Sequence, residues 1–301
     1  MNPAVMIPAV AARSAEKSAP AVWADLVKAR LTSLVLLTTA VGFYMGSPGP
    51  VDVARWLHTL VGTGLLAAGA AALNQFLERD LDALMRRTQD RPLPSGRITP
   101  GTALVFGGVI SMLGLAWLAL QTTLAAAALG ALTLALYLGV YTPLKRVSTL
   151  NTVVGAVPGA LPPLIGWAAA TGEVSAGGWA LFALQFFWQI PHFLAIAWLY
   201  RDDYARAGLK MLPVLDLEGE RTGLQSIGHA LGLLTVSLSP FVLGLAGAAY
   251  LAGAFALGVV LLGLAVRFAR RLELAHARWL FLASVIYLPA VLGLMVLDRV
   301  R

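Results

Sequence analysis

The stretch LLAAGAAALNQFLERDLDALMRRTQDRPLPSGR, residues 65–97, changes from an unbroken apolar run to a dense group of charged residues. Residues 74–97 hold nine Asp, Glu, Lys or Arg residues, in a chain in which charged residues make up only 12% of the total. The apolar run is typical of a helix inside a lipid bilayer, where polar groups are costly and usually functional. The boundary therefore predicts a membrane span with a site at its end.

The composition of the whole chain predicts an integral membrane protein. Of 301 residues, 58% are hydrophobic, and the mean hydropathy of +0.77 is far above that of a soluble domain of this length. The net charge is +7, but the basic residues are scattered between apolar runs, which favours loops beside anionic lipid over a nucleic-acid site. The absence of cysteine excludes disulfides, thiolate metal sites and cysteine nucleophiles.

Apolar runs of roughly 17–25 residues predict an all-α, polytopic membrane protein with about nine transmembrane helices. The runs are centred on residues 31–46, 57–77, 102–120, 123–140, 152–170, 177–198, 224–246, 248–266 and 279–297. Residues 1–22, rich in Ala, Pro and Ser, are expected to form a mobile tail and not a cleaved signal. Residues 23–301 are expected to form a single transmembrane domain.

The distribution of basic residues predicts the orientation of these spans. With a cytoplasmic N-terminus, five segments lie on the cytoplasmic side and hold 19 of the chain's 22 Lys and Arg residues. These segments are residues 1–30, 79–101, 141–150, 199–223 and 267–278. The asymmetry indicates that the N-terminus is cytoplasmic and the C-terminus is outside.

The charged part of the opening stretch has the spacing of a metal site. On a helix, Asn74, Glu78 and Asp82 share one face, whereas Asp80 points elsewhere. Two carboxylates and an amide oxygen suit Mg²⁺, which leaves its other positions to water and phosphate oxygens. The arginines that follow suit phosphate binding; they are Arg86, Arg87, Arg91 and Arg97. The alternative is a solvated loop whose acids pair with its own arginines.

Two more segments carry matching chemistry on the same side of the membrane. YRDDYARAGLKMLP, residues 200–213, offers Asp202 and Asp203, and its cations are Arg201, Arg206 and Lys210. YTPLKRVSTLN, residues 141–151, adds Lys145, Arg146 and Asn151, or else supplies only topology-setting cations and a helix cap. Facing acid clusters with intervening cations are what a metal-bridged diphosphate requires.

These segments resemble a known family. NQFLERDLDALMRRTQDRPLPSG resembles the first Asp-rich motif of the UbiA superfamily of intramembrane prenyltransferases, Asn-x3-(Asp/Glu)-x3-Asp before an Arg-Pro. YTPLKR, NTVVGAVPGALPPLIGW and WQIPHFLAIAWLYRDDYARAGLKMLP are more similar to one branch, the protohaem IX farnesyltransferases, or haem O synthases. The similarity covers about residues 25–215 in motifs and reaches the C-terminus in span count.

The resemblance implies a fold and a reaction. The fold would be nine helices around a central cavity open to the cytoplasmic side, in the bacterial inner membrane. The reaction would be Mg²⁺-dependent transfer of a farnesyl group from farnesyl diphosphate to protohaem IX (haem B), giving haem O. The implied partners are these two substrates, membrane lipid and a haem A synthase or oxidase assembly protein, with no nucleic acid.

The resemblance also implies roles for residues at matching positions. The metal ligands would be Asn74, Glu78, Asp82, Asp202 and Asp203, and of these Asn74, Glu78, Asp82 and Asp203 would be catalytic. The diphosphate would be bound by Arg86, Arg87, Arg91, Lys145, Arg146 and Lys210. The match departs from ubiquinone-type relatives at Leu199, where they carry an acid, so Lys210 is expected to share in neutralising the diphosphate.

The haem candidates are His192 and His229, because both lie within predicted spans near the cytoplasmic face. His192 precedes Asp203 by 11 residues, so on a continuous helix it would lie roughly 16 Å deeper on the same face. The alternative is a histidine that hydrogen-bonds a neighbouring helix. Aromatic rings that could stabilise an allylic cation, or else only pack, are Phe76, Tyr137, Tyr141, Phe186, Phe187 and Trp188.

Two other functions stay open at this point. The nearer one is a prenyltransferase that acts on a quinone precursor or another aromatic acceptor. The more distant one is a secondary transporter, which would place charges at the membrane midplane on broken helices. Prolines at positions 158, 162 and 163 could break such a helix.

Overall fold

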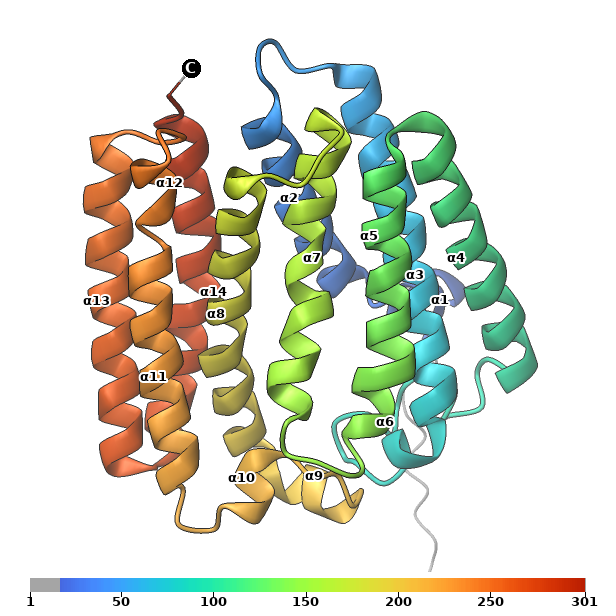
Figure 1. Ribbon diagram of the computed structural model, residues 1–301. Helices are drawn as coiled ribbons and strands as arrows, with labels where there is room; N and C mark the ends of the chain where they lie inside the picture. The colour runs from blue at the N-terminus through green and yellow to red at the C-terminus, as the bar shows by residue number, and fades with distance from the viewer. Residues whose placement is uncertain (1–16, 301) are drawn as a thin grey trace, which may run out of the picture.

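The structure, a computed structural model, describes residues 17–300, and this part of the chain is all-α, as the composition predicts (Figure 1). The helices are α1 (Ala19–Leu26), α2 (Ala29–Gly46), α3 (Val53–Asp82), α4 (Pro100–Gln121), α5 (Leu124–Leu134), the π-helix η1 (Ala135–Tyr141), α6 (Thr142–Leu144), α7 (Asn151–Thr171), α8 (Ala176–Leu199), α9 (Arg201–Arg206), α10 (Leu212–Leu215), α11 (Glu220–Val236), α12 (Ser239–Val242), α13 (Ala248–Arg271) and α14 (Leu274–Leu297). Of the predicted mobile tail, residues 1–16 lie outside the described part, and α1 begins at Ala19.

Eight helical segments in the described residues are long and apolar enough to cross a membrane. They are α2, α3, α4, the run from α5 to α6, α7, α8, α13 and α14. The remaining predicted span, 224–246, is not one helix, because α11 ends at Val236. There Ser237 and Ser239 bond back to main-chain carbonyls, and Pro240 has no N–H to donate. The count of nine spans therefore depends on the 17-residue α11, which packs against α8 and α13.

The helices run up and down, so that the three loops carrying the motifs meet at one end of the bundle (Figure 1). These loops follow α3, α6 and α8, and the short helices α9 and α10 lie beside them. Main-chain hydrogen bonds confirm the proximity, since Lys210 N donates to Lys145 O at 2.8 Å. We call this end of the bundle the motif end.

Close helix packing depends on glycine where α2 crosses α7. A Cβ added at Gly42 would lie 2.0 Å from Pro163 O, and one added at Gly166 would lie 2.0 Å from Thr39 O. Both distances are impossible for real atoms, so the two main chains touch directly. Small residues that let helices approach in this way are characteristic of membrane bundles, where hydrophobic burial does not drive one helix onto another.

Two features of helix continuity bear on function. α7 runs unbroken from Asn151 to Thr171 although it contains Pro158, Pro162 and Pro163. The broken helix that would have favoured a transporter is therefore not formed by these prolines. The irregular segment is instead η1, and π-helical turns occur frequently at functional sites.

Candidate functional site

The three residues of the first acid motif lie together on the buried face of α3, near the motif end. Asn74, Glu78 and Asp82 are 1%, 8% and 0% exposed. Asp80 points outward, with 84% of its side chain exposed beside Arg79. The arrangement is the one that the helical spacing predicts, with three oxygen-bearing side chains on one face.

Each of these three side chains is bonded to a cation. Lys28 Nζ donates to Asn74 Oδ1 at 2.7 Å, and Lys145 Nζ donates to Glu78 Oε1 at 2.7 Å. Arg91 Nη1 donates to both carboxylate oxygens of Asp82, at 2.8 and 2.7 Å. Asn74 also donates through Nδ2 to Thr142 Oγ1 at 3.2 Å. In the described residues no three Asp, Glu, His or Cys side chains cluster as a metal site.

The electrostatic environment differs between the two lysines. Burial, followed by the nearby charges of Arg91 and Lys145, lowers the pKa of Lys28 to about 7. Burial opposes the charge on Lys145 as well, but Tyr141 and Glu78 hold the pKa of Lys145 above its ordinary value. The Lys145 ammonium also lies over the Tyr141 ring, 4.4 Å from its centroid. Lys145 is therefore a firmly charged group, and Lys28 is the one whose charge the surroundings oppose.

The two aspartates of the second motif have different environments. Asp203 is 9% exposed, accepts from Arg87 N at 3.1 Å and forms an ion pair with Arg206. Asp202 has a 92% exposed side chain beside Arg201. The bond between Arg87 and Asp203 joins the first and second motifs, although they are far apart in the sequence. Only Asp203 lies in the buried contact between the two loops.

Aromatic rings and a third loop complete the contact between the motifs. Arg87 lies over the rings of Tyr200 and Tyr204 and donates to Tyr204 Oη at 3.1 Å. Asn151, which is fully buried, donates through Nδ2 to Ser148 O and Lys210 O at 2.6 and 2.8 Å. Asn151 thus joins the loop after α6 to the loop after α9 by hydrogen bonds.

The remaining predicted phosphate ligands lie farther out. Arg86, Arg146 and Lys210 are exposed at the motif end. Arg97 pairs with Asp90 at 2.6 Å, away from the first acid motif. Arg86, Arg146 and Lys210 therefore lie at the surface of the motif end.

The two candidate haem ligands lie on different helices, His192 on α8 and His229 on α11. His192 Nδ1 is 2.7 Å from Ser284 Oγ on α14, and the ring stacks on Trp188 with a centroid distance of 5.0 Å. The expectation of a continuous helix from His192 to Asp203 is wrong, because α8 ends at Leu199 and Tyr200 is not helical. The two residues therefore do not share one helical face.

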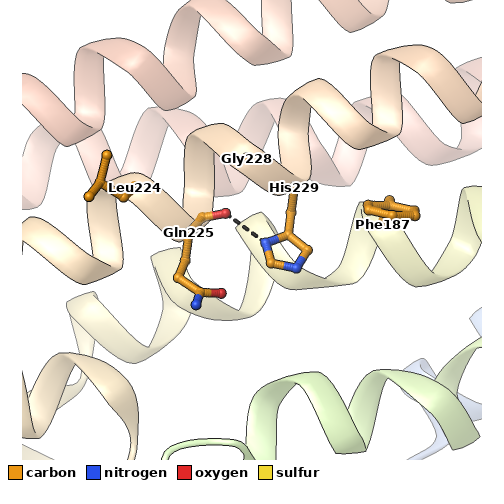
Figure 2. A pocket seen from close by; sticks show the side chains of 5 residues that line it. All are labelled: Phe187, Leu224, Gln225, Gly228 and His229. Atoms are coloured by element: carbon orange, nitrogen blue, oxygen red, sulfur yellow. Dashed lines mark hydrogen bonds between the residues drawn. The ribbon is translucent and has the colours of Figure 1, made fainter.

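His229 lies in a shallow pocket between α8 and α11, lined by Phe187, Leu224, Gln225 and Gly228 (Figure 2). Its Nδ1 is 2.8 Å from Gln225 O, one turn earlier on the same helix. If Nδ1 donates to that carbonyl, Nε2 is left as the acceptor nitrogen. This pocket is separate from the first acid motif.

Of the six aromatic candidates, two tyrosines lie beside the first motif. Tyr137 and Tyr141 stack with a centroid distance of 5.7 Å, and Tyr141 contacts Lys145. Trp188 donates to Ser284 O at 2.7 Å, and Phe187 packs against Gly232 and His229. Phe186 packs against Phe182 and Phe187, and Phe76 lies beneath Arg79.

Sequence reasoning missed Lys28, Thr142 and Tyr204. Lys28 follows a short apolar segment and counted only as a topology-setting charge, because its distance of 46 residues from Asn74 conceals the contact. The signal that could have indicated a role for Lys28 is its place immediately before a span that begins at Ala29.

Comparisons with known proteins agree with the motif pattern. The profile of the UbiA prenyltransferase family matches residues 35–288. A protoheme IX farnesyltransferase of Solibacter usitatus is 48% identical over 284 residues, which cover 91% of this chain and 97% of the relative. A digeranylgeranylglyceryl phosphate synthase structure has a TM-score of 0.78 at 15% identity, covering 93% of this chain and 98% of the other. A UbiA homologue from Archaeoglobus fulgidus bound to GPP and Mg²⁺ has a TM-score of 0.65 at 17% identity, with coverages of 91% and 99%.

The buried face of α3 predicts which carboxylates bind metal. Asp82→Asn should weaken Mn²⁺ binding on the order of 100-fold, because it removes an anionic ligand while keeping the shape of the side chain. Asp80→Asn, at the exposed position, should leave Mn²⁺ affinity unchanged. Electron paramagnetic resonance of free Mn²⁺ over detergent-purified protein measures both affinities, and size-exclusion chromatography checks folding. Equal losses at the two positions would show that the helical face does not define the site.

Proposed function

Because the chain belongs to the UbiA prenyltransferase family and, within it, to the protoheme IX farnesyltransferases, we propose that it transfers the farnesyl group of farnesyl diphosphate to a vinyl group of haem B. The products are haem O and diphosphate. The observation that carries this proposal is that the buried first acid motif, with three cations bonded to it, meets the buried Asp203 of the second motif at one end of an apolar bundle. The runner-up, prenylation of a quinone precursor, would use the same diphosphate site and differ only in the acceptor.

The donor set of the first motif fits a magnesium ion. Asn74, Glu78 and Asp82 offer hard oxygen donors on one buried face, without thiolate or imidazole. The structure of an Archaeoglobus fulgidus homologue bound to GPP and Mg²⁺ supports the same requirement here. Bound there, Mg²⁺ would supply positive charge to the leaving diphosphate. For a second ion, Asp203 is the buried candidate, and Asp202 would have to turn in from solvent.

The side chains at the motif end would perform the first step by neutralising charge. Arg91 and Lys145 are partly buried beside the acids, and the exposed cations at the motif end are Arg86, Arg87, Arg146 and Lys210. As the allylic C–O bond breaks, its electron pair stays on the diphosphate, whose developing charge these cations stabilise. Tyr137 and Tyr141 offer ring faces to the farnesyl cation that results.

In the second step the acceptor must react with the farnesyl cation before water can reach that cation. The vinyl group of haem attacks carbon 1 of the farnesyl cation and forms the new C–C bond. The porphyrin-stabilised cation left behind then takes up water and releases a proton, which gives a hydroxyethylfarnesyl side chain. The apolar walls of the bundle exclude water from the first cation. No protein nucleophile takes part in this scheme.

The most direct test is product analysis with purified protein. Incubation with farnesyl diphosphate, haem B and Mg²⁺ should give haem carrying the hydroxyethylfarnesyl group, detected by mass spectrometry, together with released diphosphate. Chelation of Mg²⁺ should abolish both signals. Prenylation of 4-hydroxybenzoate in place of haem would support the quinone-precursor alternative, and no diphosphate release at all would favour a transporter.

The orientation of the chain also belongs to this proposal. We expect a plasma membrane location with a cytoplasmic N-terminus and an outside C-terminus, and residues 23–301 as one domain, since the basic loops gather at the motif end. A reporter fused after Arg301 should be active only outside, and one inserted near Arg86 only inside. Reporters that place the 86–97 and 206–221 loops on opposite faces would contradict a shared diphosphate site.

For the haem side of the reaction we propose His192, not His229, as the histidine that contacts the porphyrin. His192→Asn can keep a hydrogen bond to Ser284 but cannot ligate iron, so it should change the spectrum of bound haem and raise the KM for haem roughly tenfold. Farnesyl diphosphate binding should stay unchanged. The control, His229→Asn, should leave the spectrum as it is. The reverse pattern would assign haem to the α8–α11 pocket, and two silent variants would exclude both His192 and His229 as axial ligands.

A haem A synthase or an oxidase assembly protein as the next partner remains a prediction from the resemblance. Co-purification from membranes would test it.

A further inference from the structure

Lys28 has a main-chain conformation that is unusual for a residue with a Cβ. It joins α1 to α2 with φ 48° and ψ 53°, in the left-handed region. Among the described residues only Leu272 is another non-glycine residue with positive φ. Such a conformation persists only where the surrounding structure enforces it, and it concentrates at functional sites.

The surroundings that enforce this turn belong to α3. Gln75 Nε2 donates to Asp25 O at 2.9 Å and to Leu26 O at 2.7 Å, the last two residues of α1. Leu26 is fully buried and packs in a cluster with Ala72. The turn is therefore fixed to α3 at the residue that follows Asn74. Its consequence is that the Lys28 ammonium meets Asn74 Oδ1 at 2.7 Å.

This contact occupies an oxygen that the proposed metal would need. An ammonium group and a divalent cation repel strongly at van der Waals distance in a buried site. A metal bound to Asn74 Oδ1 would therefore repel the Lys28 ammonium from its present position. Asn74 is held from its other side by Thr142, so its amide is already oriented.

Charge counting indicates where the displaced ammonium would go. When Lys28 is protonated, it is the third cation around Glu78 and Asp82, beside Arg91 and Lys145, and the cluster then holds one positive charge in excess. A divalent metal together with a diphosphate of about three negative charges removes that excess. A lysine released from Asn74 would then find an anionic oxygen within the same pocket.

We propose that Lys28 is a positioning residue that holds Asn74 while the metal is absent and moves to a diphosphate oxygen when metal and diphosphate bind together. The inference rests on the proposed function, because it takes Asn74 as a metal ligand. It predicts opposite effects of Lys28 on two ligands. Lys28 competes with the metal when the metal is alone, and it assists the diphosphate once the metal has bound.

The test measures these two affinities separately in the full chain, purified in detergent. Lys28→Asn removes the charge, and asparagine tolerates the left-handed region. It should tighten binding of Mn²⁺ alone by several-fold, read from free Mn²⁺ by electron paramagnetic resonance. It should weaken binding of inorganic pyrophosphate in the presence of Mn²⁺ by roughly tenfold, read by calorimetry. Lys28→Arg should restore pyrophosphate binding.

The control variant is Lys17→Gln, since Lys17 pairs with Asp25 and Asp90 near the same turn and forms no ion pair with Glu78, Asp82 or Asp203. It should leave both affinities unchanged. If Lys28→Asn does not fold, Lys28→Gly adopts the same turn without strain and gives the same comparison.

Three results would overturn the inference. Unchanged affinities in the neutral Lys28 variants, or shifts of both in the same direction, would refute the role of Lys28 and leave the proposed function intact. An absence of Mn²⁺ binding in the unmodified protein would refute the metal site, and the inference with it.

Discussion

The motif end depends on one electrostatic constraint, which is that a carboxylate buried at the end of an apolar bundle requires a positive partner. Asp82 is fully buried and is held by both of its oxygens to Arg91, and Glu78 is held by Lys145. Removing one partner of such a pair leaves an uncompensated buried charge, at a cost of roughly 3–5 kcal/mol. The position of the cations is therefore fixed as firmly as that of the acids.

The cations come from separate segments of the chain, so this constraint also determines how the loops are arranged. Arg91 lies in the loop after α3, and Lys145 follows α6. Arg87 N and Asp203 then join the first loop to α9, while Asn151 and the main chain of Lys210 join the second loop to the third. The site is therefore built from several loops that are joined to one another by hydrogen bonds, and not from one helix alone.

The fold and the reaction are determined at different levels. Proteins 15% and 17% identical to this chain have a similar fold, and a fold by itself does not define the function of a site. Diphosphate chemistry needs buried acids and cations at one end of the bundle. We propose that acceptor choice depends instead on residues deeper in the helices, such as His192, whose ring stacks on Trp188 and hydrogen-bonds Ser284 of α14. The 48% identity to a protoheme IX farnesyltransferase covers 91% of this chain, and so includes both the motif end and the deeper parts of the helices.

The membrane class, the all-α fold and the helix face shared by Asn74, Glu78 and Asp82 could be predicted from local periodicity and composition, which need no knowledge of distant contacts. The family could be predicted from the resemblance of the motifs. Three features could be seen only in the folded chain: Lys28 bonds to Asn74, Asp203 and not Asp202 is buried, and α8 ends before the second motif. Such features depend on which residues meet across tens of positions in the chain, and a left-handed turn or an interrupted helix leaves the hydrophobic pattern unchanged.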